Sequence, residues 1–124
     1  MTSKELKVGD WVSYNGDNYP ITDSSDDEVV TITNENNYEM LFACKLEPIP
    51  LDEDVLIDND WKYQSSHGEL AGWSNGRVKL YPNSKQNGGG FSFVYSSNQV
   101  MYIHYVHQLQ NLLWALGLDD ELKL

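Results

Sequence analysis

His104 and His107 stand close together near the carboxyl end of the chain, and their type and spacing invite a chemical role. Imidazole nitrogens bind Zn²⁺ and exchange protons near neutral pH. A zinc site also needs further ligands, and the nearest candidates, Cys44, His67 and loop carboxylates, form no supporting motif. We therefore expect no metal and no cofactor. A small enzyme or ligand-binding site near the two histidines stays open as an alternative.

Several other groups contain reactive or ligand-binding residue types but lack the pattern that a known chemistry requires. Cys44 follows apolar residues in an expected strand, so we expect a buried, unreactive thiol. The carboxylates of residues 23–28 lack the spacing of a calcium loop, and those of residues 52–54 and 119–121 suit helix ends. The glycines of residues 87–90 lack the lysine of a phosphate loop. No catalytic residue is predicted, and we expect a protein that is not an enzyme.

Aromatic residues are the best candidates for binding, since the chain has four tryptophans and eight tyrosines. Trp73 lies in a stretch bracketed by Gly72 and Gly76. A tryptophan exposed on a loop is typical of the contact anchors in protein interfaces. We take Trp73, together with Tyr63 and His67, as the candidate binding residues. The alternative is that Trp73 folds back over the core as a lid.

The net charge of −11 is concentrated in the first half of the chain. Residues 1–60 contain three lysines and fifteen carboxylates, whereas residues 61–124 contain five basic and four acidic side chains. An acidic surface repels phosphates, so direct nucleic-acid binding is not expected. The expected partner is a protein with a basic surface. Two alternatives are an acidic imitation of nucleic acid that inhibits a DNA-binding enzyme, and a charge that only keeps the protein soluble.

The elements that would position these residues are mostly short strands, rich in β-branched and aromatic residues. Eight are expected, over residues 8–14, 19–22, 29–33, 38–44, 61–64, 77–81, 91–95 and 100–103. Asn15-Gly16 is a strong hairpin signal, because both residue types tolerate a positive φ. Asp52 can cap a short helix over residues 54–57, and residues 65–76 are expected to be irregular.

The carboxyl end changes to the period of an amphipathic helix. Its apolar stripe consists of Val106, Leu109, Leu112, Leu113 and Leu116. Gly117 suits the end of the helix, and Leu118 can pack back in a Schellman motif. Burial of the five side chains is worth roughly 7–15 kcal/mol, so we expect this helix to be a permanent part of the fold.

Together these elements predict an α+β protein. Residues 1–50 are expected to form a strand-rich acidic lobe, a small curled antiparallel sheet or half-open, Src-homology-3-like barrel. Residues 51–124 add a short helix, antiparallel strands and the C-terminal helix packed on the sheet, and we expect them to form one compact unit. No apolar run is long enough for a membrane span, the start lacks the apolar core of a signal peptide, and a lone cysteine allows no internal disulfide. We therefore expect a cytoplasmic protein without membrane contact.

Three stretches carry a resemblance. They are Lys7-Val8-Gly9-Asp10-Trp11-Val12, Leu46-Glu47-Pro48-Ile49-Pro50-Leu51, and Tyr105-Val106-His107-Gln108-Leu109-Gln110-Asn111-Leu112. In this order they resemble a family of small uncharacterised proteins of Bacteroidetes genomes, prophages and mobile elements. The resemblance implies a bacterial, cytoplasmic, phage-derived protein and brings no activity, cofactor or catalytic residue. This chain departs from the family's usual sequence after Ala115-Leu116, so the resemblance does not predict how the helix ends. The expected function is a non-enzymatic binding or adaptor module.

Overall fold

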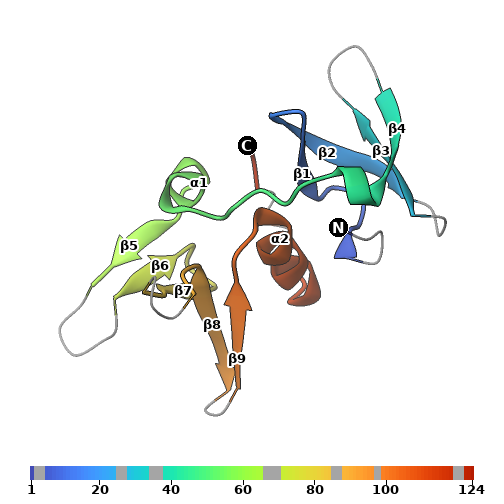
Figure 1. The fold of residues 1–124 in the computed structure, drawn as a ribbon. Coiled ribbons are helices and arrows are strands. Elements are labelled where there is room, and N and C mark those ends of the chain that lie inside the picture. Colours follow the sequence, from blue (N-terminus) through green and yellow to red (C-terminus); the bar gives the residue numbers. More distant parts are fainter. Residues whose placement is uncertain are drawn as a thin grey trace. The chain divides into compact units, whose positions relative to one another are not determined.

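The computed structural model describes residues 1, 5–24, 28–33, 38–65, 71–84, 88–96, 99–118 and 122–124. The elements in chain order are β1 (Trp11–Tyr14), β2 (Asp17–Ser24), β3 (Val29–Thr33), β4 (Tyr38–Phe42), the short 3-10 helix η2 (Ala43–Lys45), α1 (Glu53–Asp58), β5 (Lys62–Gln64), β6 (Gly72–Ser74), β7 (Lys79–Pro82), β8 (Phe91–Ser96), β9 (Gln99–Ile103) and α2 (Val106–Ala115) (Figure 1). Among these residues the strands form two antiparallel sheets, β1 to β4 and β5 to β9, each in sequence order. The expected α+β class is confirmed. No helix within the described ranges has both the length and the apolar character that crossing a membrane requires.

The described part of the chain divides into two compact units. Unit 1 consists of Met1–Ile49 and Val106–Asp120, and unit 2 consists of Pro50–Tyr105 and Glu121–Leu124. The sequence-based division at residue 50 lies next to the first boundary. That division grouped the C-terminal helix with residues 51–124, whereas the structure groups α2 with unit 1. The helical period reveals an apolar stripe, but it does not reveal which sheet receives the stripe.

The hairpin of β1 and β2 begins unit 1. Asn15 (φ 51°) and Gly16 (φ 85°) make the predicted two-residue turn. β1 is shorter than the expected strand 8–14, because Gly9 (φ 96°) places a turn before it. After η2 the chain returns to β1, where Glu47 and Ser13 exchange two backbone hydrogen bonds of 2.8 and 2.9 Å. β1 therefore has β2 on one side and Glu47 on the other.

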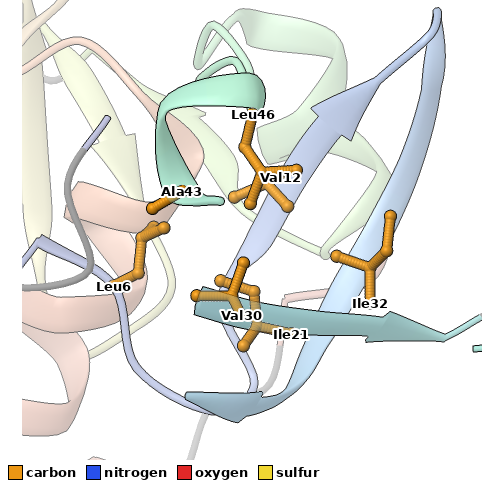
Figure 2. Packing of buried hydrophobic residues seen from close by; sticks show 7 residues of the cluster. All are labelled: Leu6, Val12, Ile21, Val30, Ile32, Ala43 and Leu46. Atoms are coloured by element: carbon orange, nitrogen blue, oxygen red, sulfur yellow. The ribbon is translucent and has the colours of Figure 1, made fainter. Parts of the chain in front are cut away.

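A hydrophobic cluster fills unit 1 between its strands and η2. Among the described residues it consists of Leu6, Val12, Ile21, Val30, Ile32, Ala43 and Leu46. Figure 2 shows these side chains extending toward one another from the N-terminal segment, the first three strands and the region of η2. Full burial of such a side chain is worth about 1.5–3 kcal/mol. The alternation of buried Val30 and Ile32 with half-buried neighbours is the period of a strand that is more deeply buried on one face.

α2 contacts β1 and contributes buried apolar side chains to unit 1. Gly117 (φ 73°) follows its end, where Leu118 N donates to Leu113 O (2.9 Å) and Gly117 N donates to Trp114 O (3.0 Å). These are the two hydrogen bonds of a Schellman motif, so the predicted end of the helix is confirmed. The expected apolar stripe is wrong at its last member, because Leu116 lies beyond the helix and is 46% exposed.

Unit 2 begins with α1, whose predicted cap is confirmed because the Asp52 carboxylate accepts a hydrogen bond from Val55 N (3.0 Å). The strands β5 to β9 follow as an antiparallel meander. β6 lies where an irregular segment was expected, and this expectation is wrong. At Gly72 an added Cβ would lie 2.7 Å from Leu80 O, so β6 reaches β7 only because this residue has no side chain. A short strand that needs glycine leaves a weak sequence signal.

Candidate functional site

β4 presents its large apolar side chains to solvent. Tyr38, Met40 and Phe42 alternate along one face of the strand, and they are 74%, 65% and 59% exposed. The other face carries Glu39 and Leu41, which pair with two buried core residues of β3. Residues paired across two strands share a face of the sheet, so Glu39 and Leu41 lie on the core side. We call the outward side chains of Tyr38, Met40 and Phe42 the β4 face.

Polar groups of β2 and β3 lie beside the β4 face on the same side of the sheet. Thr31 lies beside Met40, and Asp23 lies beside Thr31, so these three residues form one row across the sheet. In the next row, the hydroxyls of Thr33 and Thr22 form a hydrogen bond of 2.7 Å. An apolar stripe at the sheet edge is thus bordered by hydroxyls and a carboxylate.

The charged side chains in the segment that contains the β4 face all have the same sign. Residues 8–44 contain eight carboxylates and no lysine or arginine. Unit 1 as a whole has three lysines against twelve carboxylates, and unit 2 has five basic against seven acidic side chains. Nearly all of the net charge therefore belongs to the unit that carries the β4 face. A field of one sign attracts ligands of the opposite sign and repels nucleic acid.

The chemistry of the β4 face suits contact with another molecule. Tyrosine, phenylalanine and methionine are enriched in the cores of protein interfaces, because they offer large contact area at modest entropic cost. Soluble proteins seldom expose neighbouring large apolar side chains without such a use.

Sequence reasoning missed the β4 face for a physical reason. The pattern of residues 38–42 alternates cleanly, but the usual interpretation turns the face with more apolar residues toward the core. In the structure, the register with β3 decides the opposite orientation. Glu39 on the core side was the available signal, because a carboxylate next to core positions is unusual.

A second notable group in unit 1 is the buried carboxyl of Asp10, which is 1% exposed. Its Oδ2 accepts a hydrogen bond from Lys7 N (3.0 Å), and its Oδ1 lies 3.8 Å from Lys7 Nζ. Burial raises the pKa of Asp10 to about 6, although the hydrogen bond and the charge of Lys7 act in the opposite direction. A carboxyl that is so deeply buried cannot contact a ligand, and we infer that it stabilises the turn before β1.

α2 is tied to the same turn by two amide side chains. Gln110 Oε1 accepts from Trp11 N (2.8 Å), and Gln110 Nε2 donates to Gly9 O (2.9 Å). The Asn111 side chain accepts a hydrogen bond from Lys7 Nζ. These contacts fix the N-terminal segment to the helix from both sides of Gly9, in addition to apolar packing.

The three stretches that carry the resemblance build this part of the fold. Residues 7–12 and 105–112 meet through Gln110. Within the stretch 46–51, Ile49 O accepts a hydrogen bond from Val106 N (2.8 Å) at the start of α2. In this chain, the parts of these stretches that lie in unit 1, residues 7–12, 46–49 and 106–112, therefore serve the architecture of that unit.

Asp10→Asn is expected to remove a pH dependence of stability. A carboxyl whose pKa is higher in the folded than in the unfolded protein stabilises the fold at low pH, and this stabilisation is lost as the pH rises through about 6. For Asp10 the loss is on the order of 3 kcal/mol. In urea unfolding at pH of about 4, 6 and 8, the stability difference between the wild type and Asp10→Asn should change by this amount, because the contribution of buried His107 is common to both proteins. Asp17→Asn, which removes an exposed carboxylate, controls for net charge. An unchanged slope in Asp10→Asn would contradict the assignment.

Trp73 is not on an exposed loop; it is buried, as the alternative interpretation expected, although it lies in a strand. It lies in β6, is 6% exposed, and its ring meets that of Tyr63 edge to face at 5.4 Å. Tyr63 is 53% exposed and pairs with Trp73 in the register of β5 and β6. His67 lies outside the described residues. A role of Trp73, Tyr63 and His67 in binding stays a prediction.

The two C-terminal histidines belong to different units. His104, in unit 2, is half-buried and its ring lies 6.3 Å from that of Tyr105. His107, in unit 1, is 4% exposed, and burial lowers its pKa, which nearby Glu5 partly opposes. Within the residues that the structure describes, no three side chains of histidine, cysteine, aspartate or glutamate are grouped as a metal site would need.

The other groups that the sequence analysis considered are Cys44, the acidic segments and the glycine loop. Cys44 lies in η2 and is exposed, so the expectation of a buried thiol in a strand is wrong, because β4 ends at Phe42. The Asp52 side chain caps α1. Parts of the acidic loop 23–28 and of the glycine loop 87–90, and all of residues 119–121, lie outside the described residues.

Comparisons with known proteins add no relative. The chain matches no protein-family model, no curated protein and no solved structure.

Proposed function

We propose that the chain is a non-enzymatic binding module that docks a partner protein on the β4 face. The observation that carries this proposal is the orientation of β4, which turns Tyr38, Met40 and Phe42 outward and Glu39 toward the core side. In a free protein this arrangement gives up the stabilisation that burial of three large side chains would provide. A partner that covers the face recovers it.

The proposal includes the fold of the lobe. In unit 1, four antiparallel strands are followed by a one-turn 3-10 helix, and Glu47 then pairs with β1. This succession supports a half-open, Src-homology-3-like barrel, a fold that carries many unrelated functions. The resemblance of the three sequence stretches supports a bacterial protein of phage or mobile-element origin that acts in the cytoplasm.

The alternative of a nucleic-acid imitation rests on the charge of unit 1. An imitation of a phosphate backbone needs carboxylates in a regular row. In the described row of Asp23, Thr31 and Met40, one carboxylate stands beside a hydroxyl and a thioether. This arrangement favours the apolar surface as the docking site.

The test compares partner capture by the wild type and by Met40→Thr. Both proteins are immobilised, and bound proteins from a lysate of the source cells are identified. Tyr102→Thr is the matched control, because Tyr102 is 60% exposed on the edge strand β9 of unit 2. We expect a defined protein to bind the wild type and Tyr102→Thr, and to bind Met40→Thr at least about tenfold more weakly. Equal capture by all three proteins would refute docking on the β4 face.

A further inference from the structure

We infer that the open edge of β4 receives an extended, basic segment of the partner, which joins the sheet as an additional strand. The inference rests on the proposed function and names the chemistry of the partner. Four observations support it: the free backbone groups of β4, the side chains of the β4 face, the position of Glu39 and the charge of unit 1.

The hydrogen bonds between β3 and β4 decide which backbone groups are free. Ala43 N donates to Glu28 O (2.7 Å) at the end of the ladder. Bonded and non-bonded pairs alternate along an antiparallel ladder, so Leu41 and Glu39 direct their N–H and C=O groups toward β3. The three residues of the β4 face therefore direct theirs toward the opposite edge. The sheet order ends with β4, and no described strand pairs with that edge.

The free backbone groups and the exposed apolar side chains thus belong to the same three residues. A strand that pairs with this edge gains backbone hydrogen bonds along Tyr38, Met40 and Phe42. Its side chains opposite these residues lie on the same face of the sheet, where apolar groups extend the stripe. The edge and the face would be covered together by one segment.

The position of Glu39 sets the residue type between those apolar positions. Glu39 is exposed although it lies on the core side of the sheet. The residue of the added strand opposite Glu39 lies on that same side, and opposite charges across a strand pair are favourable. The segment is therefore expected to place a lysine or arginine there, flanked by apolar residues.

The charge of unit 1 argues for a basic partner and against a second copy of this chain. Residues 8–44 hold eight carboxylates and no lysine or arginine, so two copies joined at β4 would bring fields of the same sign together. A basic segment meets the opposite field. Its binding should weaken as salt screens these charges.

The probe is a capped peptide of about seven residues, the length of an ordinary strand, in which valine alternates with lysine. A first control peptide replaces each lysine by glutamate. A second control keeps the lysines but carries N-methyl groups at alternate residues, which removes the donors for one edge. Affinity is measured by titration calorimetry against the full-length protein at salt of about 0.05 and 0.5 M.

The protein variants are Met40→Thr, Glu39→Lys and the matched control Tyr102→Thr. We expect the lysine peptide to bind the wild type and Tyr102→Thr alike, and to lose at least about tenfold in affinity with Met40→Thr. N-methylation should cost a similar factor, and higher salt should weaken binding. For Glu39→Lys, we expect a peptide whose central lysine is replaced by glutamate to bind more tightly than the lysine peptide. Circular dichroism checks that each variant is folded.

Three results would overturn the inference. Equal affinity of the lysine peptide for the wild type and Met40→Thr would mean attraction by net charge alone. A preference of the wild type for the glutamate peptide would exclude a basic partner. A dimer of the wild type in sedimentation experiments that Met40→Thr abolishes would make a second copy the occupant. None of these results decides the proposed function, which has its own test. A partner that the wild type captures and Met40→Thr does not would still support docking on the β4 face.

Discussion

Leu113→Ala is expected to lower the free energy of unfolding of unit 1 by about 2–5 kcal/mol. Leu113 is 1% exposed in α2, and its truncation leaves a cavity beside the other buried side chains of the helix. The typical stability of a whole domain is about 5–15 kcal/mol, so this loss is a large part of the total. Hydrogen exchange followed by mass spectrometry measures the effect within each unit.

Leu116→Ala is the matched control for this substitution. It removes the same side chain from the same predicted stripe, but Leu116 is 46% exposed. We expect a change within about 0.5 kcal/mol, as for most surface substitutions. Similar costs for the two variants would contradict the packing of α2 described above. Faster exchange confined to unit 2 in Leu113→Ala would contradict the placement of α2 in unit 1.

Gly90→Ala is expected to destabilise unit 2 by roughly 3 kcal/mol, from backbone strain and steric overlap together. Gly90 has a φ of 70°, in the left-handed region that an alanine adopts at a cost. An added Cβ would also lie 2.5 Å from His104 Nδ1 and 2.7 Å from Ile103 O. Relief of this overlap requires β8 and β9 to move apart at their first pair, Phe91 with Ile103.

Gly88→Ala separates the two contributions. Gly88 has a similar φ of 90°, but an added Cβ would have no atom within 4 Å. It should cost only the backbone strain, about 1 kcal/mol. The buried Trp61 and Trp73 report unfolding of unit 2 by fluorescence during a urea titration. Equal effects of the two substitutions would show that β8 does not pass His104 closely.

Local signals explain which elements the sequence predicted well. The turn at Asn15-Gly16, the cap at Asp52 and the Schellman motif at Gly117 depend on residues within a few positions of one another. Each forms through local backbone and side-chain preferences, whatever the rest of the chain does. Such features can be predicted from a short window.

Features that depend on distant residues could not be predicted in this way. The choice of sheet for α2 is fixed by contacts such as Gln110 with Trp11, which join residues about a hundred positions apart. The burial of Trp73 depends on β7, which approaches closely at Gly72. Composition and spacing carry no direct record of such pairings.

The candidate site belongs to this second class. Tyr38, Met40 and Phe42 read as an ordinary strand, and a shift of one residue in register would exchange the two faces. Pairing of Leu41 with Val30 and of Glu39 with Ile32 sets the orientation. The site was therefore hidden in a segment that the sequence predicted as a strand without predicting which of its faces lies inside.

The most direct measurement of the central claim compares the stabilities of Met40→Thr and Leu41→Thr. Threonine suits a strand at either position, so the difference reports which side chain is inside. Met40 is 65% exposed, whereas Leu41 packs against the core cluster. In urea titrations, Met40→Thr should change the free energy of unfolding by less than about 0.5 kcal/mol, and Leu41→Thr should lower it by about 1–2 kcal/mol. A larger loss for Met40→Thr than for Leu41→Thr would place Met40 in the core and contradict an outward β4 face.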